Sequence, residues 1–228
     1  MTDNRHFEPW ITDGVRRNLE SLVRHADVPE TYRTAMHALG VDLALELSRH
    51  FEGTRDLVLI CTAEDADYLA RGVLERLTMK HTVHVVCYWS ERFTVAGREM
   101  APIIGRYVEP LNPAQLTDIV IVKSIISSSC SVRTHLTEFL DEVKAQVPIY
   151  IVAPVMYREA PHWLEREFPR RISRQFRYLT CAVDDVRLDD GIVVPGIGGS
   201  VYRNLGLGDV AAKNRLRPRL IAVRSVGA

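Results

Sequence analysis

A lysine and a run of serines occur together in the segment IVIVKSIISSSCSV, residues 119–132. The aliphatic residues predict a buried parallel strand, and Lys123 follows it directly, where such sheets place ligand-binding residues. The candidate phosphate-binding residues come next and are Ser127, Ser128, Ser129, Cys130 and Ser131. Unpaired amide groups at a helix start attract anions, serine hydroxyls add donors, and the lysine adds a positive charge. The segment therefore predicts a site for a phosphate or another anion.

A simpler interpretation is a hydroxyl-rich turn that only caps the following helix, with Ser131 as the N-cap. This explains one serine but not four. The segment is not a Walker A loop, because no Gly-Lys-Ser or Gly-Lys-Thr follows a glycine-rich turn. Cys130 is interpreted as a small buried residue, since the sequence places no histidine to activate it as a nucleophile.

Lys123 is our candidate catalytic residue, and its position supports two interpretations. It can contact an anionic group of a ligand or act as an acid or base, or its stem can pack while its ammonium group extends to solvent. Glu64 and Asp65, the candidate acids of the site, and Asp67 can pair with Lys123 across the crevice. They can equally be acids that favour the first turn of a helix. The pairing predicts that neither partner alone tolerates neutralisation.

Strand and helix patterns alternate along the chain. Apolar residues at three- and four-residue steps, such as Leu39, Leu43 and Leu47, predict helices over 18–50 with a break at 27–30. Strands are predicted at 56–63, 81–89, 118–122, 148–156 and 176–185, and further helices at 64–77, 131–145 and 160–169. This alternation predicts an α/β fold with a parallel sheet and helices on both faces.

Ligands of such sheets bind beyond the carboxyl ends of the strands. That rule places residues 62–67, 88–92 and 123–131 around the expected site. Residues 90–117 are polar and punctuated by proline and glycine, which indicates a functional loop, a disordered loop or a small hairpin.

Composition narrows the classes of partner. The 228 residues are 46% hydrophobic and 25% charged, and 29 basic residues balance 29 acidic ones, so neither nucleic acid nor a membrane is an expected partner. The polar N-terminus predicts no signal peptide or membrane span. The four cysteines form no CxxC pair and the histidines no ligand pattern, so we expect a reducing cytoplasm, no disulfide framework and no metal site.

Residues 18–209 resemble the type I phosphoribosyltransferases, with the motifs in the same order along the chain. The resemblance is closest to the uracil branch of the family. Residues 119–132 match the family's strand, acidic pair and Thr-Gly-Gly-Ser-like loop, which holds the 5-phosphate of phosphoribosyl pyrophosphate. The segment VVPGIGGSVYRNLGLGD, residues 193–209, resembles the Pro-Gly-Leu-Gly-Asp segment that reads the pyrimidine through backbone groups. Residues 22–47 resemble the family's N-terminal helices, and 57–77 its first strand, pyrophosphate loop and helix.

The resemblance implies one domain over 1–228, with N-terminal helices at 18–50, an α/β core at 56–185 and a tail at 186–228. The N- and C-terminal segments are expected to form a small hood, and the protein is expected to be a homodimer. Magnesium is implied if phosphoribosyl pyrophosphate is the donor. The residues implied to contact a ring are Val194, Gly196, Ile197, Gly198 and Gly199.

Three parts of the expected site depart from the family pattern. Lys123 and Ser124 replace the acidic pair, and acids at 64–65 stand where uracil enzymes have an arginine. A carboxylate beside a pyrophosphate disfavours binding. Gly199 and Tyr202 occupy the positions of the tail aspartates.

These departures predict a divergent enzyme that binds a phosphorylated sugar or nucleotide. It would transfer or process a (phospho)ribosyl group on a specialised acceptor. The alternative is a catalytically inactive homologue that acts as a nucleotide-binding regulator or partner subunit.

Overall fold

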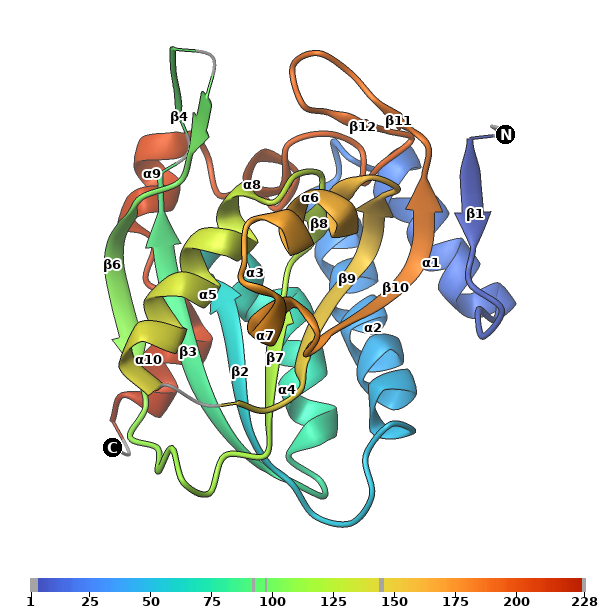
Figure 1. Cartoon of the computed structure of the whole chain (residues 1–228). Helices are drawn as coiled ribbons and strands as arrows, with labels where there is room; N and C mark the ends of the chain where they lie inside the picture. Colours follow the sequence, from blue (N-terminus) through green and yellow to red (C-terminus); the bar gives the residue numbers. More distant parts are fainter. Residues whose placement is uncertain (1–3, 92, 97, 144–145, 227–228) are drawn as a thin grey trace.

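The computed structural model describes residues 4–91, 93–96, 98–143 and 146–226. Its main sheet has the strand order β1-β10-β9-β7-β2-β3-β6, and β8 adds to β9 (Figure 1). The strands in that order are β1 (Arg5–Phe7), β10 (Phe176–Asp184), β9 (Ile149–Tyr157), β7 (Asp118–Val122), β2 (Asp56–Thr62), β3 (Thr82–Ser90) and β6 (Ile103–Val108), with β8 at Ile125–Ile126. The five central strands are parallel, whereas the two edge strands β1 and β6 are antiparallel to their neighbours.

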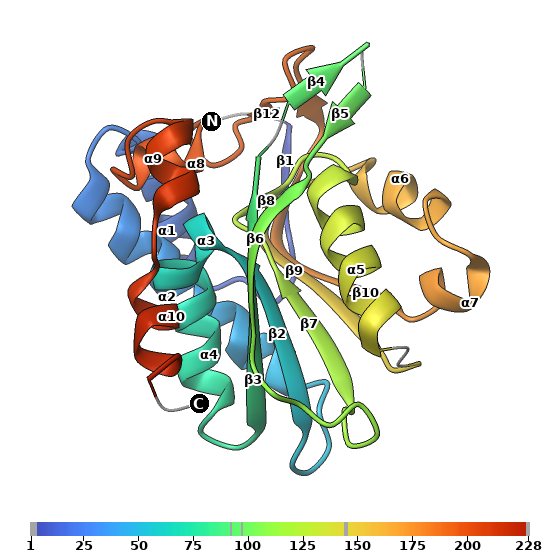
Figure 2. The ribbon, with the colours of Figure 1, turned by 90° about the vertical axis from the view of Figure 1, so that its left-hand side faces the viewer.

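Helices cover both faces of this sheet (Figure 2). One layer contains α1 (Asp13–Arg24), α2 (Pro29–Ser48), α3 (Ala63–Asp65), the π-helical turn η1 (Ala66–Ala70), α4 (Arg71–Leu77) and α10 (Arg219–Arg224). The other layer contains α5 (Cys130–Val143), α6 (Ala160–Arg166) and α7 (Arg170–Ser173). The predicted α/β class, a central, mostly parallel sheet flanked by helices, is therefore confirmed.

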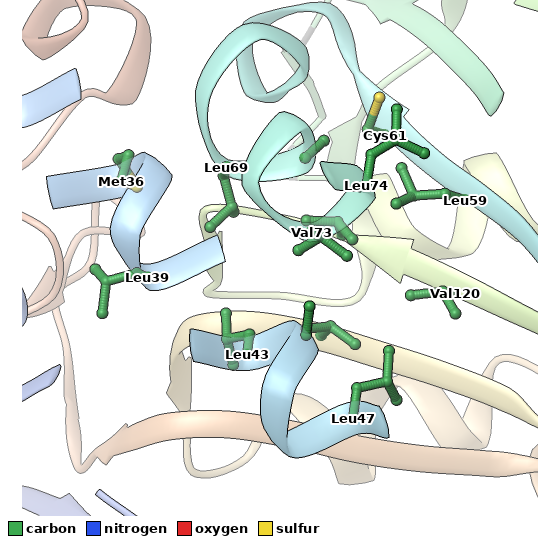
Figure 3. Packing of buried hydrophobic residues seen from close by; sticks show 14 of the residues in the cluster. Met36, Leu39, Leu43, Leu47, Leu59, Cys61, Leu69, Val73, Leu74 and Val120 are labelled. Carbon is green, nitrogen blue, oxygen red and sulfur yellow. The ribbon is translucent and has the colours of Figure 1, made fainter. Parts of the chain in front are cut away.

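Two apolar cores hold the layers together because the central strands are buried on both faces, as in other parallel sheets. In the first core, α2 presents Met36 and the predicted leucine stripe to η1, α4 and the sheet (Figure 3). Leu39, Leu43 and Leu47 are all buried, and so is Ala35 one turn earlier in the helix. In the second core, α5 packs Leu136 and Phe139 against the opposite face.

Segments from the two ends of the chain meet beyond the carboxyl ends of the parallel strands (Figure 1). The tail contributes β11 (Val186–Arg187), β12 (Val193–Val194), α8 (Val201–Asn204) and α9 (Val210–Arg215). The Tyr32 hydroxyl of α2 donates to the Ile197 carbonyl at 2.9 Å, and Arg33 donates to the Leu205 carbonyl. These bonds fix the tail loop against the N-terminal helices.

The long connection after β3 is a small hairpin, one of the three forms that its composition allowed. It forms β4 (Phe93–Val95) and β5 (Arg98–Met100), and the chain then returns as the antiparallel strand β6. Within the described part of the chain, no helix has both the length and the apolar character needed to cross a membrane.

Candidate functional site

A cavity of about 280 Å³ lies at the carboxyl ends of β2, β3 and β7, where the strand order predicts a ligand site. Its lining comes from several segments of the chain: Thr62 and Glu64 at and after the end of β2, Ser90 at the end of β3, Ala101 before β6, Lys123, Ser124 and Ile125 after β7, Ser127 and Ser131 around the start of α5, and residues 190–193, 197, 199–202 and 213 of the tail. Segments that are distant in sequence therefore line the same cavity.

The Lys123 side chain is buried beside the cavity, and its ammonium group forms an ion pair there. Its ammonium nitrogen lies 2.6 Å from Asp65 Oδ2, 2.9 Å from Thr62 Oγ1 and 3.4 Å from Glu64 Oε1. The Thr62 hydroxyl also donates to Asp65 Oδ2 at 2.7 Å, which holds that carboxylate in place. The predicted pairing of Lys123 with Glu64 and Asp65 is confirmed, and the alternative of an ammonium group extended to solvent is wrong.

Asp67 does not take part in this cluster, which corrects its inclusion among the expected partners of Lys123. Its carboxylate accepts hydrogen bonds from the backbone amides of Arg219 and Leu220, at 3.0 and 2.8 Å. The physical reason is that a charged acceptor at a helix start satisfies unpaired amides. Asp67 therefore anchors α10 instead of lining the cavity.

Lys213, which the sequence did not single out, is the second buried ammonium group of the cavity. It belongs to α9, and its nitrogen donates to the Ser90 carbonyl at 2.6 Å. The Trp89 ring nitrogen donates to the Leu216 carbonyl at 2.6 Å, which secures the same part of the tail to β3.

Glu64 is under the electrostatic influence of both lysines. Burial of its carboxyl group acts to raise the pKa, but Lys123 and Lys213 act in the opposite direction and hold the pKa of Glu64 below its ordinary value. The carboxyl group therefore stays ionised into more acidic solution than an isolated glutamate.

We expect the Glu64→Gln variant to lose part of the pH dependence of stability in acid. Because the folded pKa is lowered, ionised Glu64 contributes stability above its unfolded pKa of about 4.3, and this is lost as the pH falls through the folded pKa. The free energy of unfolding of the wild type minus that of the variant, from urea titrations between about pH 6 and about pH 3, should therefore decrease toward acid. A constant difference would contradict this assignment.

The serine loop is only partly directed into the cavity. Ser127 and Ser131 line it, whereas Ser129 lines a separate pocket beside Trp163 and Arg166. Neither of the other two predicted phosphate-binding residues, Ser128 and Cys130, is among the described residues that line these two pockets.

The prediction that Ser131 is the N-cap of the helix is wrong. Helix α5 begins at Cys130, and the Ser129 carbonyl accepts the hydrogen bond from Arg133 N at 2.8 Å. Ser131 instead lies in the first turn. Of the residues in this first turn of a 14-residue helix, Ser131 is the one that lines the cavity.

The glycines of the tail loop form the tight turn that their sequence indicated. Gly196, Gly198 and Gly199 have φ values of +58°, +78° and +101°, which favour glycine. Of the five residues implied to contact a ring, Ile197 and Gly199 line the cavity; Val194, Gly196 and Gly198 are not in its described lining.

Three carbonyl groups of this loop are bound by the protein's own side chains. Arg5 donates to the Gly196 carbonyl at 2.6 Å, while Tyr32 and Asn204 donate to those of residues 197 and 198. Arg5 is itself held by both carboxylate oxygens of the fully buried Asp184, each at 2.6 Å. These bonds fix the loop's shape, and Gly199 is the cavity-lining glycine with open space around it.

The carboxylates here do not fit a resident magnesium ion. Glu64 and Asp65 both contact the Lys123 ammonium group, whose positive charge disfavours a second cation beside the same carboxylates. Among residues 4–91, 93–96, 98–143 and 146–226, no group of three or more His, Cys, Asp or Glu side chains is arranged to hold a metal. We therefore assign no step to a protein-bound metal.

Comparison with known proteins identifies a similar fold. No protein-family model matches the chain, and no curated protein matches it in sequence. The solved structure of the AQ2163 protein from Aquifex aeolicus is similar with a TM-score of 0.66 and 15% identity, over 86% of this chain and 95% of that chain. This likeness shows a shared fold.

Two solved hypoxanthine-guanine phosphoribosyltransferases are more distant. The Bacillus anthracis enzyme has a TM-score of 0.40 and 13% identity, over 69% of this chain and 76% of that one. The L. donovani enzyme has a TM-score of 0.40 and 16% identity, over 68% and 80%. Likenesses at this level carry no argument about this chain, so its function has to be argued from the cavity.

Proposed function

We propose that the protein is a divergent phosphoribosyltransferase-like enzyme, related to the uracil branch. It binds a phosphorylated sugar or nucleotide in the cavity and transfers or processes a (phospho)ribosyl group on a specialised acceptor. The observation that carries this proposal is that Ser127 and Ser131, at the start of α5, line one cavity together with two buried lysines. Helix amides, hydroxyl groups and ammonium groups are all donors to phosphate.

The charges around the cavity favour a monophosphate over a magnesium pyrophosphate. Lys123 and Lys213 are balanced by Glu64 and Asp65, and Asp190 adds one further carboxylate to the lining. A monophosphate at the start of α5 would be held by helix amides and hydroxyl groups. It would therefore not need to pair with these charged side chains. A pyrophosphate that extended toward Glu64 would meet a carboxylate, which disfavours its binding. Ordinary uracil salvage is therefore not the proposed reaction.

We expect Ser131→Ala to weaken phosphate-ester binding by about 10-fold or more, since a hydrogen bond to a charged group contributes about 1.5–3 kcal/mol. Isothermal titration with ribose 5-phosphate and UMP measures this, and phosphoribosyl pyrophosphate with and without magnesium tests the charge argument. Ser173→Ala in α7, outside the cavity lining, is the control and should bind as the wild type does. Absence of binding by both monophosphates, or equal affinity in Ser131→Ala, would refute the proposal.

One observation favours a second candidate, a catalytically inactive nucleotide-binding regulator or partner subunit. Lys123 replaces an acid that the resemblance gives to the ribose site, and its ammonium group is already bound to Asp65. A residue held in this way can have a purely structural role. Binding of a nucleotide without turnover of any acceptor would support the regulator.

A further inference from the structure

Ser90 and His135 form a hydrogen-bonded pair at the cavity. Ser90 Oγ lies 2.7 Å from His135 Nε2, and Ser90 is part of the cavity lining. His135 is four residues beyond Ser131 in α5, so both side chains lie on one face of the helix. A serine hydroxyl in hydrogen-bonding reach of an imidazole is the arrangement of an activated nucleophile and its base.

The imidazole is held in a fixed orientation. Its ring stacks on the ring of Tyr88 with centroids 5.1 Å apart and planes inclined by 23°, and both residues are fully buried. Tyr88 and Ser90, two residues apart in β3, both contact the His135 ring. The strand thus supplies both the hydroxyl and the support for its partner.

A cation is anchored to the same serine. Lys213 Nζ lies 2.6 Å from the Ser90 carbonyl oxygen and lines the same cavity. An ammonium group there can stabilise negative charge that develops on a reacting group beside the serine. Nucleophile, base and cation therefore come from β3, α5 and α9, three elements that only the folded chain brings together.

We propose that Ser90 is a nucleophile, with His135 as its base, that accepts a phosphoryl group from a phosphate monoester bound in the cavity. Ser90 Oγ forms a bond to phosphorus while the bond from phosphorus to the ester oxygen breaks. The hydroxyl proton passes to His135 Nε2 and then to the departing alcohol oxygen. Water then attacks the phosphorus of the phosphoserine, and His135 takes a proton from it. The bond from phosphorus to Ser90 Oγ breaks, His135 gives the proton to Ser90 Oγ, and inorganic phosphate is released.

This inference rests on the proposed function only for the phosphate-ester class of the ligand. The nucleophile itself is tested with a fluorophosphonate probe, which needs no natural ligand. Attack by Ser90 breaks the phosphorus–fluorine bond and leaves a stable adduct after loss of fluoride. Intact mass and peptide mapping are expected to place one adduct on Ser90, and Ser90→Ala should abolish it.

His135→Gln separates a chemical role of the histidine from a structural one. Glutamine retains hydrogen-bonding groups but cannot act as a base, so labelling of Ser90 should slow by about 100-fold or more. The circular dichroism spectrum and the urea midpoint show whether the His135→Gln variant folds. If it does not fold, labelling is measured on Ser90→Thr, which keeps a hydroxyl group. Equal labelling rates in folded His135→Gln and wild type would overturn the proposal.

The chain contains a matched control pair. Ser21 and His25 of α1 and its C-terminal end are hydrogen-bonded at 3.2 Å, but this pair is exposed and outside the cavity lining. Ser21→Ala should therefore leave labelling unchanged, and an adduct on Ser21 instead of Ser90 would contradict the proposal.

Turnover is measured with p-nitrophenyl phosphate as a small phosphate monoester. The wild type should release nitrophenolate and Ser90→Ala should not; equal release by both would refute the phosphoryl step. The binding titrations with ribose 5-phosphate and UMP are independent of this result. Monophosphate binding without labelling of Ser90 would reject the nucleophile alone, whereas labelling without monophosphate binding would reject the proposed function alone.

Discussion

Replacing Lys123 with methionine is expected to destabilise the folded chain by about 3–5 kcal/mol, the usual cost of removing one partner of a buried ion pair. Lys123 and Asp65 are 7% and 1% exposed, so methionine would leave the Asp65 carboxylate desolvated and without its cation. The Thr62 hydroxyl would still donate a hydrogen bond to this carboxylate. The free energy of unfolding from urea titration near neutral pH measures the loss.

Removing the other charge of the pair, with Asp65→Asn, should destabilise the chain to a similar extent, because Glu64, at the longer distance of 3.4 Å, is then the carboxylate beside the Lys123 ammonium group. The double variant K123M/D65N should lose less than the two single losses combined, by a coupling of about 0.5–3 kcal/mol. Additive losses would show that Lys123 and Asp65 do not stabilise each other.

An exposed ion pair supplies the control for these variants. Arg71 and Glu75 are 2.7 Å apart in α4 with both side chains about half exposed. Arg71→Met should therefore change the free energy of unfolding by less than about 1 kcal/mol. A loss as large as that of Lys123→Met would mean that charge removal, and not burial of the pair, determines the result.

The central sheet and its covering helices could be predicted from the sequence, because buried strands are continuous aliphatic runs and buried helix faces carry apolar residues at three- and four-residue steps. The aliphatic run at 118–122 became β7, and the leucine stripe of 39, 43 and 47 became the buried face of α2. The edge strands were harder to predict. β1 has only three residues, and β6 alternates half-buried with exposed positions inside a segment rich in turn residues.

The partners within the site were only partly predictable. Thr62 and Asp65 are three residues apart, the spacing of a capping pair, and this signal could have favoured Asp65 over Asp67 as the partner of Lys123. No comparable local signal marks Lys213. It lies 123 residues after Ser90 in a short tail helix, so its place in the cavity is a product of tertiary packing.

Two glycines mark where α2 packs against the π-helical turn and α4, the segment that follows the site acids. A Cβ atom on Gly40 would lie 2.2 Å from the Leu69 carbonyl oxygen, and one on Gly72 would lie 2.3 Å from the His37 carbonyl oxygen. The backbone of α2 and the backbone of the η1 and α4 segment therefore lie close together at both glycines. Glycine lowers helix propensity, so these positions have a packing reason to lack a side chain.

Gly40→Ala and Gly72→Ala are each expected to destabilise the chain by about 3 kcal/mol, the upper part of the range for overpacking, because the clashing atoms belong to helix backbones that cannot rotate away. Thermal and urea unfolding measure the loss. Gly14→Ala in α1 is the matched control: its Cβ would meet only Thr12 Oγ1, at 3.5 Å, so alanine's helix preference should leave stability unchanged or higher. If all three variants were equally stable, the helices would have room to separate, and the close backbone packing of α2 against η1 and α4 would be refuted.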